Sequence, residues 1–466
     1  MAQVGTADAP LRVAMIGSGP AAFYATEHLF KQTQLVVGVD MFERLPTPFG
    51  LVRLGVAPDH PKIKSVTKIY DRIAANPNFR FFGNVEYGKH ITLADLRAHY
   101  HQILFATGSP TDRRMDIPGE DLPGSYTATD FVAWYNGHPD YRDRVFDLSH
   151  PRAAVVGVGN VAVDVVRILS RTPAELEKTD IADYALAALR QSRIKEVYLL
   201  GRRGPVQAAF TPPELKELGE LAETDTIVYP EEVELDTLSA QALETDKDPL
   251  TKQKVHLLQT YATRAPVGKP RKLFIRFLVS PVELYANGTG NITKMKIVRN
   301  VLVQHESGSI AAHATNQFED LPVDLVFRSV GYRGLPLPEI PFNQRAGTIL
   351  NQDGRILDAD NQMPIAGLYT AGWIKRGPSG VIGTNKLDSS ATVSCMLEDF
   401  ASGKILAPAQ PDSAAAENLV RTRQPQFFSY ADWQKLDALE IARGAAEGRP
   451  RVKFTRVEEM LAAVGK

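Results

Sequence analysis

The chain has 466 residues, more than one ordinary hydrophobic core accommodates, so two or three domains are expected. Hydrophobic residues make up 44% and charged residues 23% of it, which excludes a disordered or collagen-like chain. Basic residues number 53 and acidic residues 54, so no net charge draws the chain onto nucleic acid or a membrane. The single cysteine, Cys395, excludes an internal disulfide, a cysteine-ligated iron–sulfur site and a zinc ribbon, and no metal site is expected.

No apolar run reaches the roughly 18 residues that a membrane-spanning helix needs. The first ten residues lack the basic start and apolar core of a signal peptide, and they lack the arginines of a transit peptide. We therefore expect a cytoplasmic protein without membrane insertion.

The chain opens with a strand, a glycine turn, a helix and a second strand. An apolar run at 11–16 leads into Gly17 and Gly19, with Ala22 at the third position of the motif. A helical pattern and a strand at 35–42 follow, and Glu43 ends that strand. Gly17 allows the tight turn, Gly19 lets a pyrophosphate approach the helix N-terminus, and Glu43 suits ribose hydroxyls while repelling a 2′-phosphate. This pattern predicts an adenine dinucleotide site of the FAD or NAD type.

The same order of elements recurs later, with a different charge at its end. A strand at 152–156 leads into Gly157 and Gly159, and a helix and a strand at 196–200 follow. That second strand ends at Arg202 and Arg203, where an NAD-selective site would carry an acid. Two guanidinium groups suit a 2′-phosphate. The two turns together predict FAD in the first site and NADP(H) in the second.

The remaining segments are predicted more coarsely. A third glycine turn at 367–373 and the run 377–383 start a late helix, whose amides suit the negative edge of a reduced flavin. Residues 225–320 alternate apolar and polar residues and predict a β-rich region. Residues 404–418 are rich in Ala, Pro, Ser and Asp and predict a linker, whereas 427–466 carry helical patches.

Long strings of the sequence are similar to the adrenodoxin-reductase type of ferredoxin–NADP reductase, a family of FAD enzymes. The similar strings are GSGPAAFYA (17–25), PFGLVRLGVAPDHP (48–61), WYNG (134–137), GVGNVAVDVVRIL (157–169), GRRGPVQAAFTPPELKEL (201–218), GWIKRGPSGVIGTN (372–385) and GRPRVKF (448–454). They run through nearly the whole chain.

The resemblance implies an α/β fold with two Rossmann-like domains, in which an NADP domain is inserted into a glutathione-reductase-like FAD domain. The expected FAD domain comprises 1–111 and 337–466, and the expected NADP domain comprises 112–336. The FAD contacts that it implies fall on Ala21, Glu43, Leu51, Val85, Trp373, Gly380, Val381 and Ile382. The NADP contacts that it implies fall on Val158, Gly159, Asn160, Val161, Arg202, Arg203 and Glu214, with Gly380 beside the nicotinamide.

The resemblance also implies an activity and a partner. NADPH would give a hydride to FAD, and electrons would pass singly to an acidic [2Fe–2S] ferredoxin. His60 and Glu217 would lie near the flavin and the nicotinamide pocket, His60 as a polar anchor or as a proton shuttle. A basic docking face is expected on the cationic run Arg264, Lys269, Arg271, Lys272 and Arg276. The chain would be a monomer or a weak dimer.

Two other classes of protein stay open from the residues. One is an FAD- and NADPH-dependent monooxygenase, or the NADPH-oxidising subunit of a larger synthase. The other is a dinucleotide-binding sensor or scaffold without enzyme activity. Reduction of the flavin by NADPH and the response to ferredoxin distinguish these from a reductase.

Overall fold

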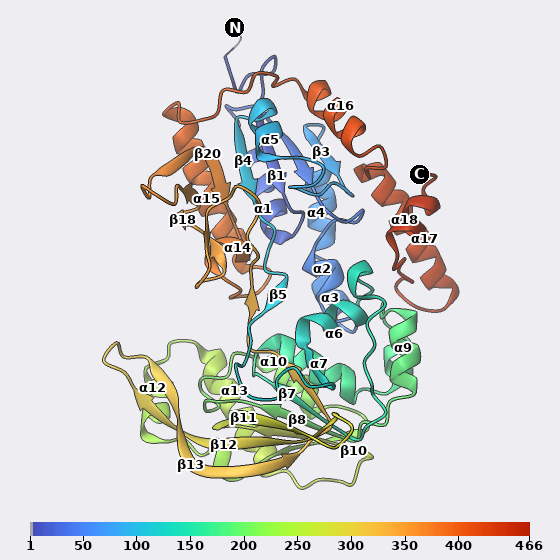
Figure 1. Ribbon diagram of the computed structural model, residues 1–466, viewed down its shortest axis with the longest axis vertical. Helices are drawn as coiled ribbons and strands as arrows, with labels where there is room; N and C mark the ends of the chain where they lie inside the picture. The colour runs from blue at the N-terminus through green and yellow to red at the C-terminus, as the bar shows by residue number, and fades with distance from the viewer. Residues whose placement is uncertain (1–2) are drawn as a thin grey trace. The chain divides into compact units, whose positions relative to one another are not determined.

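The computed structural model describes residues 3–466, which form two compact units (Figure 1). Unit 1 contains residues 3–111, 136–142 and 332–466, and unit 2 contains 112–135 and 143–331. The chain thus returns to unit 1 five residues before the boundary expected from the sequence. The segment 136–142 joins unit 1 because Lys453 Nζ donates to Asn136 O (3.0 Å) and Arg142 Nε donates to Thr455 Oγ1 (3.3 Å).

Unit 1 is built on a seven-stranded sheet with the order β18-β19-β20-β4-β1-β2-β3. Strands β20, β4, β1, β2 and β3 are parallel, and β18 and β19 extend one edge antiparallel. Their bounds are β1 Leu11–Ile16, β2 Val37–Phe42, β3 Phe79–Phe82, β4 Gln102–Phe105, β18 Asn351–Gln352, β19 Arg355–Leu357 and β20 Pro364–Thr370. The short pairs β5 Thr111–Asp112 with β15 Tyr332–Arg333 and β16 Phe342–Asn343 with β17 Thr348–Ile349 complete its strands.

Helices cover both faces of this sheet, so β1 is buried on both sides. Val13 and Met15 pack in one apolar cluster with α1, α15 and α17, whereas Ala14 and Ile16 pack in another with α5 and α16. This alternation explains why the strand reads as a continuous apolar run. The helices are α1 Pro20–Phe30, α2 Leu51–Leu54, α3 Pro61–Lys64, α4 Thr67–Ala74, α5 Leu93–His99, α14 Trp373–Arg376, α15 Thr384–Ala401, α16 Ser413–Arg423, α17 Tyr430–Ala446 and α18 Val457–Ala463, with the 3₁₀ turn η1 Pro139–Tyr141.

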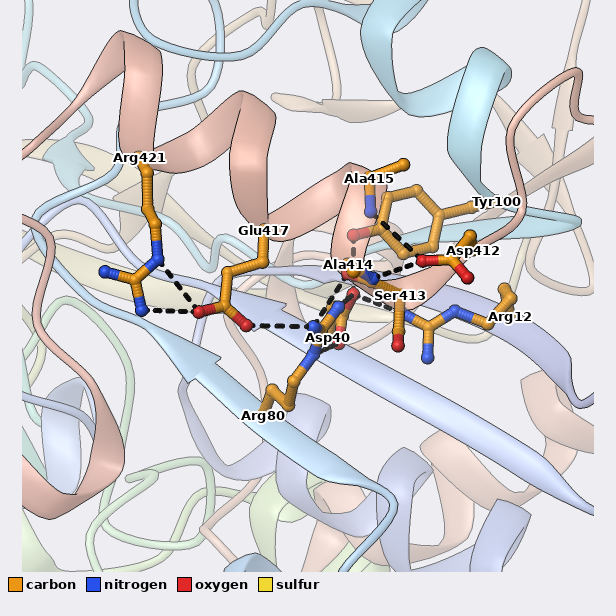
Figure 2. Close-up of polar contacts among 10 residues, drawn as sticks. All are labelled: Arg12, Asp40, Arg80, Tyr100, Asp412, Ser413, Ala414, Ala415, Glu417 and Arg421. Atoms are coloured by element: carbon orange, nitrogen blue, oxygen red, sulfur yellow. Dashed lines mark hydrogen bonds and ion pairs between the residues drawn. The ribbon is translucent and has the colours of Figure 1, made fainter.

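A buried carboxylate in the middle of β2 fastens α16 to the sheet (Figure 2). Asp40 is fully buried and accepts from Arg12 (2.5 Å), from two nitrogens of Arg80 (2.8 and 2.6 Å) and from the Tyr100 hydroxyl (2.7 Å). Arg80 also donates to Ser413 O (2.8 Å), at the start of α16. The second half of the expected linker at 404–418 is therefore helical and anchored, because Arg80 reaches from β3 to the N-terminus of α16.

Unit 2 contains a six-stranded parallel core sheet with the order β6-β14-β7-β8-β10-β9. Helices α7, α10 and α13 contact its strands, while Ala154, Val156, Tyr198 and Leu200 pack with the antiparallel sheet β11-β12-β13. The strands are β6 Ser125–Thr127, β7 Arg152–Val156, β8 Glu196–Leu200, β9 Thr224–Val228, β10 Arg271–Arg276, β11 Val279–Ala286, β12 Ile292–Gln304, β13 Ile310–Pro322 and β14 Leu325–Arg328.

Helices interrupt the region that the sequence predicts as β-rich. The helices of unit 2 are α6 Ala128–Tyr135, α7 Asn160–Ser170, α8 Pro173–Leu176, α9 Asp183–Arg190, α10 Pro212–Gly219, α11 Pro230–Val233, α12 Thr237–Thr245 and α13 Pro249–Ala262. The expectation for 225–320 is thus wrong between 230 and 262, where Asp236 and Asp248 cap α12 and α13. Among the described residues, no helix combines the length and the apolar character required to cross a membrane.

Candidate functional site

The first glycine turn lies at the carboxyl ends of the parallel strands of unit 1. Ile16 pairs with Phe42 on one side and with Phe105 on the other, so the residues after β1, β2 and β4 share one edge. Gly17 has φ +99°, and a Cβ there would lie 2.6 Å from Ala106 O. Only glycine satisfies both conditions.

Gly19 plays a different part in the same turn. It caps α1 in an extended conformation, with φ −78°, and a Cβ built on it meets no atom within 4 Å. Ala21 and Ala22 are buried in α1, so Ala22 packs in the core. The bare backbone at Gly19 and the N-terminus of an 11-residue helix fit a pyrophosphate.

Glu43 is fixed beside this turn. Its Oε2 accepts from the amide and the hydroxyl of Ser18 (3.1 and 2.7 Å), and its Oε1 accepts from the amide of Leu45 (3.1 Å). A carboxylate has about four acceptor positions, so one remains for a ribose hydroxyl. The negative charge at the end of β2 suits FAD better than a nucleotide with a 2′-phosphate.

Distant segments of unit 1 meet at the same turn. The Phe49 amide donates to Ser18 O (3.0 Å), and a Cβ on Gly50 would lie 3.1 Å from the Gly19 Cα. A Cβ on Gly372, whose φ is +77°, would lie 2.7 Å from the Ala21 Cβ. The segments that carry Leu51 and Trp373 are thereby brought to the turn.

The other residues expected to contact FAD differ in exposure. Leu51 and Val381 are 41% and 55% exposed, although both are large and apolar. Gly380 has φ +80°, in the loop before α15. Val85 is buried in one apolar cluster of unit 1, and Ile382 is partly buried against the other. An exposed apolar side chain such as Leu51, which follows Gly50 beside the first glycine turn, fits an aromatic ring system that would cover it.

The loop before α15 is stiffened by its own hydrogen bonds. Trp373 Nε1 donates to Ser379 O (3.2 Å), and the Gly372 amide donates to Asp388 Oδ2 (2.6 Å). The Trp373 ring lies beside the Tyr332 ring, with centroids 5.4 Å apart. Trp373 is therefore held in one orientation at the start of α14.

The second glycine turn repeats the first in unit 2. Gly157 has φ +128°, and a Cβ there would lie 2.2 Å from Ser329 O, whereas Gly159 has nothing within 4 Å. Asn160 Oδ1 accepts from the Thr211 amide (3.0 Å), and Val158 O accepts from two further amides of the 209–210 segment. Val161 continues α7, partly exposed. This turn also leaves bare backbone at a helix N-terminus.

The end of β8 carries two uncompensated positive charges. Arg202 is exposed and Arg203 is half-buried, and neither guanidinium has an ion-pair or hydrogen-bond partner within residues 3–466. Burial and the neighbouring charge of Arg202 lower the pKa of Arg203. Two like charges without a counterion favour an anion, and the 2′-phosphate of NADP(H) fits them.

Both glutamates expected at the nicotinamide pocket bind one buried arginine. Arg167 of α7 is 0% exposed and donates to Glu214 Oε2 (3.1 Å) and Asp164 Oδ1 (2.7 Å), and its Nε lies 3.4 Å from Glu217 Oε2. The sequence reasoning missed Arg167. The sequence does carry a signal for Arg167, because it is a cation within the apolar helical run 161–169 and follows Asp164 by three residues.

His60 is held by backbone structure in unit 1. It caps α3, is buried, and its amide donates to Ala57 O (3.0 Å). Pro61 occupies the first position of the helix, as the sequence predicts for a stiff segment. The role of His60 stays a prediction.

Comparisons with known proteins give the family. NADPH-ferredoxin reductase FprA of Mycobacterium tuberculosis is 46% identical over 465 residues, covering 97% of this chain and 98% of its own. The human mitochondrial NADPH:adrenodoxin oxidoreductase is 40% identical over 465 residues, covering 97% and 92%. The chain belongs to the family of NADPH–ferredoxin and adrenodoxin reductases.

A solved structure of this reductase family agrees with the fold. M. tuberculosis FprA in complex with NADPH superposes with a TM-score of 0.90 at 45% identity, over 98% of this chain and 99% of that one. The α/β fold with two dinucleotide-type units is thereby confirmed. No protein-family model matches the chain.

Two cations of the basic docking face expected for this reductase on residues 264–276 lie against acids. Arg276 is 4% exposed and binds Glu232 (2.8 Å) and Glu319 (2.9 Å), and Arg271 lies 3.4 Å from Glu223. The prediction for Arg276 is wrong, because β10 lies inside the parallel sheet and its last residue is buried against Glu232 and Glu319.

Three further cations of the run differ from one another. Arg264 donates to Gly219 O (2.9 Å) and Lys269 donates to Leu221 O (2.6 Å). Arg264 and Lys272 stay exposed. The expected run therefore offers two widely exposed cations.

Proposed function

We propose that the chain is an FAD-dependent NADPH–ferredoxin reductase. Bound FAD would accept a hydride from NADPH and would pass electrons one at a time to the cluster of a [2Fe–2S] ferredoxin. The observation that carries the proposal is the pair of glycine turns whose following strands end in opposite charges, Glu43 in unit 1 and Arg202–Arg203 in unit 2.

Each set of residues has a separate task in this proposal. Gly17, Gly19 and Glu43 hold the adenosine and pyrophosphate of FAD, and Leu51 and Val381 cover apolar ring surface. In unit 2, Val158, Gly159, Asn160 and Val161 hold the pyrophosphate of NADPH. Arg202 and Arg203 select its 2′-phosphate.

We assign positioning roles to His60, Glu214 and Glu217. Hydride transfer to a flavin requires no general acid, so a residue near the rings contributes by orienting them. Arg167 supports this role, because its guanidinium contacts both glutamates on one face of α10 (3.1 and 3.4 Å). An acidic ferredoxin, a monomeric or weakly dimeric state and a cytoplasmic location remain predictions from the sequence.

The test is anaerobic reduction of the flavin-loaded protein by NADPH and, separately, by NADH. Cytochrome c reduction is then followed with and without a recombinant [2Fe–2S] ferredoxin. We expect rapid bleaching by NADPH and cytochrome c reduction that depends on ferredoxin. Bleaching without a ferredoxin effect supports a monooxygenase or a synthase subunit, which measured oxygen consumption separates. A lack of bleaching supports a binding protein.

A further inference from the structure

Helices α3 and α4 of unit 1 carry a cationic surface. Lys62 and Lys68 are exposed, as is Arg72, which lies one turn after Lys68 on the same side of α4. Ile63 is 41% exposed among them, although it is large and apolar. We call Lys62, Ile63, Lys68 and Arg72 the α3–α4 face.

The positive charge of this face is not compensated within the chain. None of its three cations has an ion-pair or hydrogen-bond partner for its side chain in the described part of the chain. The acid on α4, Asp71, accepts from the Tyr430 hydroxyl (2.6 Å). Some other surface cations are paired, as Lys31 is with Glu27 (2.9 Å). Since basic and acidic residues nearly balance over the whole chain, the α3–α4 face is a local excess of positive charge.

The face is continuous with the segment proposed to contact the flavin. The Val56 amide donates to Leu51 O (2.7 Å), the His60 amide to Ala57 O (3.0 Å), and the Lys64 amide to His60 O (3.3 Å). Leu51, α3 and the start of α4 thus follow one another through short, hydrogen-bonded turns.

This segment is also rigidly anchored. Arg53 of α2 is buried, with both terminal nitrogens on the Glu440 carboxylate (2.8 and 2.6 Å). Lys453 Nζ donates to Arg53 O (3.4 Å). An electron-transfer protein that binds the α3–α4 face would therefore meet a fixed surface. Only a short length of chain separates that surface from Leu51.

We propose that the α3–α4 face is the docking surface for the acidic ferredoxin. The inference rests on the proposed function and names the place where its partner binds. Cations without counterions attract an acidic protein and steer its approach, and Ile63 supplies the apolar contact that a specific complex needs. In the alternative run at 264–276, Arg271 and Arg276 lie against acids, and two further cations donate to backbone carbonyls.

Matched charge reversals separate the two surfaces. The first variant combines Lys68→Glu with Arg72→Glu, and the control combines Arg264→Glu with Lys272→Glu, so each changes the net charge equally. At low ionic strength we expect the first to raise the ferredoxin KM about tenfold, and the control to leave it within about twofold. Near 1 M salt, where the Debye length is about 3 Å, the difference disappears.

Two further measurements keep the result specific. Reduction of menadione, an uncharged acceptor, stays at the wild-type rate in both variants, since Lys68 and Arg72 hold no cofactor. Ala75→Lys adds a cation three residues after Arg72, and we expect it to lower the ferredoxin KM.

An unchanged KM in the first variant, or an equal rise in the control, overturns the docking proposal while the reductase function stands. A wild-type enzyme that is reduced by NADPH but does not pass electrons to ferredoxin overturns both. If the double reversal does not fold, Lys68→Gln with Arg72→Gln tests the same prediction, with a smaller rise expected.

Discussion

Replacing Gly17 or Gly19 with alanine separates the needs of the fold from those of the dinucleotide. The two glycines stand two residues apart in one turn, yet their surroundings differ. Gly17 has φ +99° and a carbonyl oxygen 2.6 Å from the position of a Cβ, whereas Gly19 has φ −78° and open space. Gly17→Ala should therefore destabilise unit 1, and Gly19→Ala should leave its fold intact.

The structure sets the magnitudes. At Gly17, the left-handed conformation costs about 1–2 kcal/mol and the overlap with Ala106 O about 1–3 kcal/mol, so roughly 2–5 kcal/mol is lost. For a unit of this size that lowers Tm by about 4–20 °C. At Gly19, a change within about 1 kcal/mol is expected. A methyl group there would hold the pyrophosphate off the amides, and one lost charge-assisted hydrogen bond weakens binding about 10- to 100-fold.

The assay pairs thermal unfolding of the apoproteins with fluorescence titration by FAD. We expect Gly17→Ala to melt early and Gly19→Ala to melt with the wild type while binding FAD weakly. Wild-type affinity for FAD in Gly19→Ala would refute the assignment of the first turn as the pyrophosphate site. Wild-type stability of Gly17→Ala would refute the steric argument.

Three other predictions follow from side chains. Glu440→Gln leaves Arg53 buried without a carboxylate and should lower the free energy of unfolding, measured with a denaturant, by about 3–5 kcal/mol. As a control, Glu398→Gln at an exposed pair should lower it by less than about 0.5 kcal/mol, and equal losses would contradict the argument. The double variant Arg202→Ala with Arg203→Ala should raise the KM for NADPH about 100-fold and leave the KM for NADH unchanged, because only contacts with the 2′-phosphate are lost. Equal rises in both KM values would contradict the assignment of these arginines to the 2′-phosphate. Burial and the charge of Arg12 lower the pKa of His101 in the folded protein. The stability that neutral His101 contributes is therefore complete above its ordinary pKa of about 6.5 and is lost as the pH falls below that value. His101→Gln should flatten the plot of unfolding free energy against pH below about pH 6.5, and an unchanged slope would refute this prediction.

The parts of the fold that the sequence predicts are governed by local chemistry. The first strand and the helix after Gly19 begin and end within a few residues of expectation, because buried parallel strands and glycine turns leave short-range patterns. A capping residue marks a helix inside the expected linker: Asp412 accepts from two amides at the start of α16. Composition alone did not distinguish a capped helix from a linker there.

In the candidate site, too, residues with a local sequence signal could be predicted, whereas their partners from distant parts of the chain could not. The charges at Glu43 and Arg203 could be placed from the sequence because each follows the end of a buried strand by at most three residues. The buried partners could not, because no local pattern couples Arg276 to Glu232 or Arg167 to Glu214. The prediction of Arg276 as a docking residue is wrong for this reason, since an arginine in a sequence has no visible counterion until the chain is folded.

Buried ion pairs also explain how the distant parts of unit 1 select one another. Arg53 and Glu440 are 387 residues apart, and Arg80 reaches Ser413 across 333 residues. A misplaced C-terminal segment would leave the Arg53 and Glu440 charges buried without partners, at a cost of several kcal/mol. The apolar contacts of α17 tolerate small shifts, but the bidentate geometry of Arg53 on Glu440 does not. We infer that these pairs fix the register in which 332–466 closes unit 1, and with it the position of α2 beside the first glycine turn.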